Sequence, residues 1–337
     1  MTDEQFTPIV GQVSLDPYCS SKPRLLGVLD TNALLSSIDN DCRLPGRRSR
    51  LLQMTDGGTV ALYAADHVYG ETYRRLPRIA LSSPIPIDAL RRRFEQEYLP
   101  ALRFVTVSTA DVADPQVLAI TDPDDVPTGQ LAKLIPPCVV FSDDRHLRRP
   151  GFAPADWHAA ARAAVAMADG VEKQEATAML VVGAGFGTAN LIKFVAAKLG
   201  APAWLVFLGL VGVGAAALWR PERRQVAAKY AGPVAEALFQ MVEQALIEER
   251  LGREGLRQVI VPALAEPSLK QQIAIVLARQ TEPLLAKEVQ ALMQSSFSDE
   301  MVPTITEVRN VLSDNTEFFQ AERHRWQFGR QAAPWHH

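Results

Sequence analysis

Short apolar runs alternate with amphipathic segments between residues 24 and 150. Four of the runs have the length and composition of buried strands, at 25–29, 60–63, 104–107 and 138–141. The segments between them have helical spacing, at 49–55, 67–76, 88–98, shortly after 111, and at 128–134. Near-continuous apolar strands separated by helices are typical of a parallel sheet covered on both faces. The pattern therefore predicts an α/β domain over residues 23–150.

Beyond residue 150 the pattern becomes helical and unusually apolar. A helix is expected from 154 to 178, and two uncharged runs follow at 176–192 and 199–219. The second run has 21 residues, which as a helix is about 30 Å long and sufficient to cross a bilayer. We expect residues 154–222 to form a helix and a glycine-rich hairpin that contacts the membrane through 176–219. A helical linker is expected over 223–266.

Two other interpretations of the apolar segment remain open. One is a buried helical hairpin or an interface covered by a partner, including a second copy of the chain. The other is a dinucleotide loop, because 180–190 resembles a strand followed by a glycine-rich turn. That loop has Thr188 where the third glycine is expected, and no acidic residue follows the next apolar run.

Composition and cysteine content narrow the class of protein. The chain has 337 residues, 47% of them hydrophobic, and a net charge of -3. These values exclude a wholly disordered chain and fit two or three folding units. Cys19, Cys42 and Cys138 are widely spaced with no CxxC pair, so we expect reduced thiols and no zinc site. Residues 1–22 are polar, predict a flexible N-terminus, and lack the pattern of a secretory signal.

Acidic residues recur where the predicted strands end. Asp30 follows the first strand, and other acids stand on or before the helices that come after later strands: Glu71, Asp122, Asp124, Asp125, Asp143 and Asp144. Ligands of open parallel sheets bind at the carboxyl ends of the strands. Converging carboxylates supply the oxygen ligands that Mg²⁺ and Mn²⁺ prefer, and such metals support phosphodiester hydrolysis.

Residues 25–147 resemble the PIN-domain nucleases. The resemblance is carried by four segments: Asp30-Thr31-Asn32 after a hydrophobic strand, Tyr69-Gly70-Glu71-Thr72-Tyr73, Asp122-Pro123-Asp124-Asp125-Val126-Pro127, and Val140-Phe141-Ser142-Asp143-Asp144-Arg145-His146-Leu147. It implies a three-layer domain with a parallel sheet. The four family acids fall on Asp30, Glu71, Asp125 and Asp144, with Asp122, Asp124 and Asp143 as alternative metal ligands. Asn32 or Ser142 is expected to orient a phosphate or a metal-bound water. Arg145 lies beside the acids and is a candidate for orienting the substrate, with a plain solvated surface role as the alternative.

Residues 267–330 predict helices at 269–279, 283–292 and 303–312, followed by strands at 317–320 and 325–329. This order is similar to a winged-helix domain. The resemblance implies that the third helix and the wing contact nucleic acid, through Thr304, Thr306, Arg309, Asn310, Arg323 and Arg325. The helix carries a single basic residue, which is little for duplex binding. A winged helix that binds protein therefore remains an alternative.

Together the two resemblances imply a Mg²⁺- or Mn²⁺-dependent endoribonuclease with RNA as substrate, and DNA or a protein as a further partner. The apolar segment places it on the cytoplasmic face of the inner membrane, with a soluble cytoplasmic enzyme as the alternative. A non-catalytic nucleic-acid-binding or scaffold protein, and a toxin-like ribonuclease restrained by an inhibitor protein, are the other functional hypotheses.

Overall fold

The structure is a computed structural model that describes residues 23–44, 46, 48–108, 114–183, 240–297 and 303–334. The chain divides into two compact units. Among the described residues, the first unit takes in 23–165 and 254–334, and the second takes in 166–183 and 240–253.

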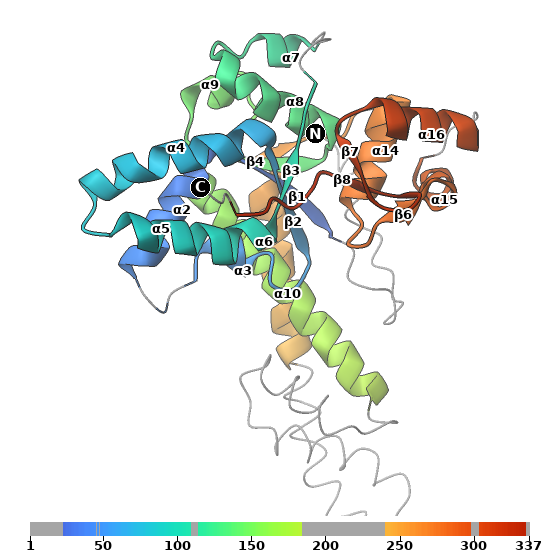
Figure 1. The fold of residues 1–337 in the computed structure, drawn as a ribbon. Coiled ribbons are helices and arrows are strands. Elements are labelled where there is room, and N and C mark those ends of the chain that lie inside the picture. Colours follow the sequence, from blue (N-terminus) through green and yellow to red (C-terminus); the bar gives the residue numbers. More distant parts are fainter. Residues whose placement is uncertain are drawn as a thin grey trace, which may run out of the picture. The chain divides into compact units, whose positions relative to one another are not determined.

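A five-stranded sheet of order β3-β2-β1-β4-β5 lies at the centre of the first unit (Figure 1). β1 (Leu25–Leu29) pairs in parallel with β2 (Val60–Ala65) and with β4 (Cys138–Phe141). β3 (Leu102–Val105) pairs in parallel with β2, two residues earlier in the chain than the sequence predicts. The mostly parallel sheet confirms the predicted α/β class.

The fifth strand was not predicted. β5 (Ile260–Val261) lies in the segment expected to be a helical linker and pairs antiparallel with Cys138 and Val139 of β4. Residues 240–257 of that segment are helical, as expected. Because Ile and Val favour extended backbone, the chain leaves the helix there and covers the open edge of β4.

Helices connect the strands of this sheet. Those around the acidic segments are α2 (Thr31–Arg43), α3 (Arg50–Gln53), α4 (Asp66–Ser82), α5 (Ile87–Arg93), a π-helical turn (Phe94–Tyr98), α6 (Leu99–Ala101), α7 (Pro115–Leu118), a 3₁₀ turn (Pro123–Asp125), α8 (Val126–Leu134) and α9 (Arg145–Arg148). α2 is absent from the sequence prediction. Its Ser, Asp and Asn residues are weak helix formers, and burial of Leu34 and Ile38 offsets that weakness.

The two faces of the sheet bury different side chains. In β1, Leu26 and Val28 belong to the hydrophobic cluster that includes α8 and the C-terminal helices. Between them, Gly27 allows a close approach of its neighbours, because a Cβ there would lie 2.6 Å from Leu62 Cδ2 and 2.7 Å from Phe141 Cε2. The close packing holds β4 against β1 at the end where the acidic residues follow.

The C-terminal residues form three helices and a three-stranded antiparallel sheet of order β6-β8-β7. The elements are α14 (Leu269–Ala278), β6 (Leu284–Leu285), α15 (Ala286–Ser296), α16 (Ile305–Asp314), β7 (Phe318–Glu322) and β8 (Arg325–Phe328). The three helices and the last two strands were predicted. β6 was expected to be the start of the second helix.

These C-terminal elements share one hydrophobic core with the α/β domain, although the sequence suggested two separate domains. Phe328 is fully buried with its ring centroid 5.3 Å from that of Tyr63. The Tyr63 hydroxyl donates to the carbonyl of Ala278 at 2.8 Å. Backbone bonds of 2.7 and 2.8 Å join Phe104 of β3 to Arg330. The C-terminal chain therefore covers the edge of β3.

The second unit contains the end of α10 (Trp157–Gly183) and the helical residues up to 253. The two segments cross closely at Gly170, where a Cβ would lie 2.6 Å from the carbonyl oxygen of Ala245. Lys173 forms an ion pair with Glu248 on the facing segment. These contacts hold the two helical segments together within the second unit.

The predicted membrane hairpin falls mainly on residues 184–219, which lie outside the described residues. Of the helices that the structure describes, none is both long and apolar enough to span a bilayer.

We predict that Phe328→Ala destabilises the whole first unit by about 3–5 kcal/mol, because the substitution opens a cavity in the shared core. Urea denaturation followed by circular dichroism and by tryptophan fluorescence should show both signals shifting together. Phe319→Ala is the matched control, since Phe319 on β7 is 43% exposed, and should change stability by less than about 1 kcal/mol. Loss of only the C-terminal structure would contradict a shared core.

Candidate active site

The register of β1 with β4 places the first acidic residue. Leu29 pairs with Phe141, so the chain leaves both strands side by side at Asp30 and Ser142. Asp30 is 3% exposed, and it accepts hydrogen bonds of 2.7 Å from the Ser142 hydroxyl and from the Thr31 backbone N–H. Both donors are neutral. They orient the carboxylate without cancelling its charge.

Ser142 also positions Asp144. The Ser142 oxygen accepts a 2.9 Å bond from the Asp144 backbone N–H. Asp144 in turn caps α9, accepting from the His146 backbone N–H at 2.8 Å. Its other oxygen lies 3.5 Å from the Asn32 side-chain amide. One serine therefore links the acids that follow β1 and β4.

Glu71 reaches the same place from α4. Its Oε2 accepts a 2.6 Å bond from the Thr31 hydroxyl. Its Oε1 accepts from Arg75 Nη1 at 3.0 Å, one helical turn further along. Thr31 thus joins Glu71 to the chain segment that carries Asp30.

Asp125 is the fourth acid of the group and stands immediately before α8. It is 9% exposed, and its Oδ2 is buried with no hydrogen-bond partner. Burial, with added repulsion chiefly from Asp30 and Asp144, raises the pKa of Asp125 to about 7. An orphaned oxygen among like charges is a position that a cation would stabilise.

The four carboxylates interact electrostatically with one another. Burial raises the pKa of Asp30, the bonds from Ser142 and Thr31 lower it, and repulsion from Glu71 and Asp144 raises it further. The structure therefore brings together Asp30, Glu71, Asp125 and Asp144 around the carboxyl ends of β1 and β4. We refer to these four residues as the acidic cluster.

The alternative ligands from the sequence have other contacts. Asp122 caps the 3₁₀ turn by accepting from the Asp124 N–H at 3.0 Å, and its charge contributes to the raised pKa of Asp125. Asp124 is exposed. Asp143 accepts a 2.9 Å bond from the Trp157 indole N–H, which holds the start of α10. These contacts give Asp122 and Asp143 local structural roles.

His67 is a neighbour of the acidic cluster that the sequence analysis missed. It precedes Glu71 by four residues on α4, so the two share a helix face. Its Nδ1 is buried without a partner. Burial lowers the pKa of His67, while Glu71 and Asp124 raise it. The i, i+4 spacing from Glu71 was the signal in the sequence.

Arg145 lies at the rim of this site. It is exposed, and its Nε lies 3.3 Å from His146 Nε2. The His146 Nδ1 also contacts the hydroxyl of Thr121. The predicted orienting residues therefore differ in setting: Ser142 is buried within the hydrogen-bond network, Asn32 borders it, and Arg145 faces solvent.

The predicted nucleic-acid contacts in the C-terminal elements divide into two groups. Thr304 caps α16 in a reciprocal pair with Glu307, and Arg325 donates to the Pro283 carbonyl at 2.9 Å. These two side chains make hydrogen bonds within the fold. The others are exposed on α16 or on the turn between β7 and β8: Thr306, Arg309, Asn310 and Arg323.

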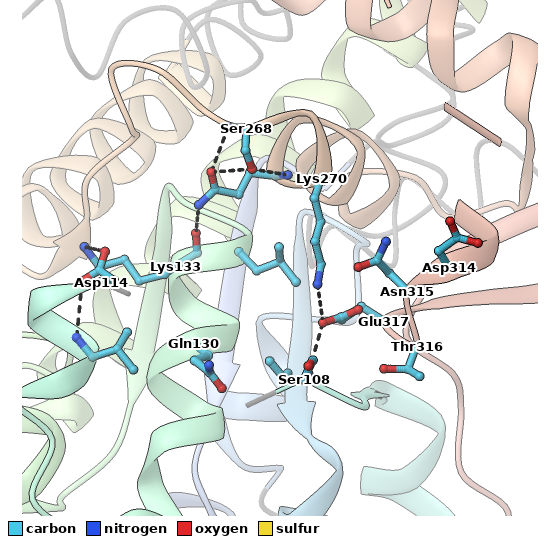
Figure 2. A pocket seen from close by; sticks show the side chains of 14 residues that line it. Ser108, Asp114, Gln130, Lys133, Ser268, Lys270, Asp314, Asn315, Thr316 and Glu317 are labelled. Atoms are coloured by element: carbon cyan, nitrogen blue, oxygen red, sulfur yellow. Dashed lines mark hydrogen bonds and ion pairs between the residues drawn. The ribbon is translucent and has the colours of Figure 1, made fainter. Parts of the chain in front are cut away.

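A cavity of about 610 Å³ lies away from the acidic cluster, lined by α8 and the C-terminal elements (Figure 2). Glu317, 1% exposed, accepts from Lys270 at 2.8 Å and from the Ser108 backbone N–H at 3.2 Å. Lys133 pairs with Asp114 at 3.2 Å. The bond from Ser108 to Glu317 holds the segment after β3 against the C-terminal elements, and the Lys133–Asp114 pair joins α8 to the residue that precedes α7.

A divalent cation fits the chemistry of the acidic cluster, because its donors are carboxylate oxygens and Asp125 Oδ2 lacks a partner. Within the described ranges, however, no three His, Cys, Asp or Glu side chains stand close enough together to hold a metal ion as they are. Binding therefore requires rotation of the carboxylates toward one another.

Comparisons with protein-family models, curated proteins and solved structures find no match to the chain.

We predict that Asp125→Asn changes the pH dependence of stability. The folded state holds the Asp125 proton up to about pH 7, whereas the ordinary pKa is 3.8. Wild-type stability should therefore fall as pH rises from about 4 to 7. Without divalent cations, the variant should be about 1–2 kcal/mol more stable than wild type at pH 8 and similar at pH 4.5.

Urea denaturation at the two pH values measures this difference. Asp88→Asn, an exposed change on α5, removes the same charge away from the cluster and should leave the pH dependence unaltered. A variant that is less stable than wild type at pH 8 would show that Asp125 is not under electrostatic stress.

Proposed function

We propose that this chain is a metal-dependent phosphodiester hydrolase of the PIN nuclease type, and that its substrate is RNA. The observation that carries the proposal is the mutual electrostatic interaction of four carboxylates, which come from the segments after β1 and β4, from α4 and from the segment before α8, together with the buried, unpartnered Oδ2 of Asp125. The mostly parallel α/β architecture is compatible with that family. The choice of RNA rests on the resemblance of the four acidic segments alone.

In this proposal Asp30, Glu71, Asp125 and Asp144 hold one or two Mg²⁺ or Mn²⁺ ions. Bound metal would supply activation of water and stabilisation of charge on the phosphate. The chain itself holds the carboxylates in position. Ser142 and Thr31 fix the carboxylates through neutral hydroxyl donors, 2.7 Å from Asp30 and 2.6 Å from Glu71. In the same proposal Asn32 and Arg145, at the border of the cluster, contact the substrate.

We propose further that residues 267–330 are a winged-helix module that recruits nucleic acid. Support comes from the order of three helices and an antiparallel sheet, and from the exposure of Arg309 and Arg323. Those two cations are few, so the module is expected to add modest affinity that falls with salt concentration.

The acidic cluster is tested by Asp30→Asn and Asp144→Asn. Each should reduce Mn²⁺-dependent cleavage of a mixed-sequence RNA by at least about 100-fold, because loss of a metal-holding carboxylate removes several kcal/mol of transition-state stabilisation. Gel analysis of end-labelled RNA, with and without a chelator, measures the effect. Circular dichroism checks that both variants keep the fold.

Asp88→Asn is the matched control and should cleave like wild type. Equal cleavage by wild type and Asp30→Asn would mean that the activity comes from a contaminant or from another site. RNA binding without cleavage in all the proteins would instead favour the alternative of a non-catalytic nucleic-acid-binding protein.

A further inference from the structure

Glu71 differs from the other members of the acidic cluster in having a cationic partner. Arg75 Nη1 lies 3.0 Å from Glu71 Oε1. In the described part of the chain, Asp30, Asp125 and Asp144 form no ion pair with Arg or Lys. The donors to the carboxylates of Asp30 and Asp144 are backbone N–H groups, a serine hydroxyl and an amide. Arg75 is therefore the counter-ion of the cluster.

Both oxygens of Glu71 are engaged. The Thr31 hydroxyl donates to Oε2, and the Arg75 guanidinium donates to Oε1. A divalent cation bound to Glu71 would meet a positive charge already in contact with that carboxylate. Guanidinium and metal repel each other, and both draw on the same lone pairs. Arg75 and the metal thus compete for Glu71.

The geometry makes Arg75 easy to displace. The pair is an i, i+4 contact on α4, and the Arg75 and Glu71 side chains are 40% and 28% exposed. Partly exposed pairs of this kind contribute little to stability, since solvent screens them and the side chains lose freedom. The Thr31 bond lies on the other oxygen and holds Glu71 in place when Arg75 leaves.

We infer that Arg75 is a displaceable counter-ion, which occupies Glu71 in the metal-free protein and weakens metal binding until the ion replaces it. This inference rests on the proposed metal site. It assigns Arg75 a role in tuning metal affinity, separate from holding the metal or contacting RNA.

The experiment measures Mn²⁺ binding to the full chain without RNA, by the loss of the free-ion electron paramagnetic resonance signal. Arg75→Gln should bind Mn²⁺ about three- to tenfold more tightly than wild type, because one contact and one repulsive charge are removed. Arg74→Gln is the matched control. It removes the same charge from the neighbouring, exposed position, and should change affinity less than twofold.

A double-mutant cycle tests whether the effect passes through Glu71. In a Glu71→Gln background, which binds Mn²⁺ more weakly, Arg75→Gln should give at most the small change seen for Arg74→Gln. Equal effects of Arg75→Gln and Arg74→Gln in the wild-type background would overturn the inference.

The outcomes separate this inference from the proposed function. If wild type binds Mn²⁺ and Asp30→Asn does not, while Arg75→Gln changes nothing, the metal site stands and the role of Arg75 fails. If neither wild type nor Arg75→Gln binds Mn²⁺, both fail. If Arg75→Gln bound Mn²⁺ and wild type did not, the inference would be supported, because Arg75 would then prevent metal binding altogether.

Discussion

The parallel pairing of β1 with β4 is the constraint on which the rest of the site depends. It brings Asp30 beside Ser142, and the serine then bonds to Asp30 and to the backbone of Asp144. A shift of one residue in this register would turn the side chains of β1 to opposite faces. Gly27 protects the register, because no side chain there would fit between Leu62 and Phe141. Core packing thus determines the spacing of the acids.

The C-terminal elements pack against the sheet that contains β1 and β4 and so help to hold it. They bury one face of the sheet, cover the edge of β3 through Arg330, and contribute Phe328 to the core beneath Tyr63. Arg103 on β3 donates to the carbonyls of Gln280 and Thr281, which adds polar contacts to the same junction. The C-terminal elements are therefore a structural support of the α/β domain. Arg309 and Arg323 are exposed on these elements.

Much of the fold was predictable because strands and helices differ in hydrophobic period. The four parallel strands were located within two residues, since their runs are almost wholly apolar. α2 was missed because Ser37, Asp39 and Asn40 resemble a loop locally, and only tertiary burial favours the helix. β5 was missed because it has only two residues, which are too few to show the hydrophobic period of a strand. Local sequence contains too little information about contacts made far along the chain.

The acids of the candidate site were predictable by their places after strands, while their partners were not. His67 and Arg75 lie four residues before and after Glu71, and the helix predicted at 67–76 already contains all three. The sequence did not indicate that His67 is partly buried with an unpartnered Nδ1, or that Arg75 forms an ion pair with Glu71. The separate pairing of Asp143 with Trp157 likewise depends on the position of α10. Sequence spacing therefore indicates where charge gathers, and the structure shows which charges are compensated.

The neutral hydrogen-bond donors around the acidic cluster orient the carboxylates and leave their negative charge in place. Hydroxyl and backbone donors from Ser142 and Thr31 orient Asp30 and Glu71 but add no net positive charge. Burial of Asp125 and the repulsion from Asp30 and Asp144 therefore raise the pKa of Asp125 to about 7 in the folded chain. Lysine or arginine donors in their place would offset the negative charge of the acids and weaken their attraction for a cation. Arg75 supplies one such charge at an exposed position, where it is weakest and most readily exchanged.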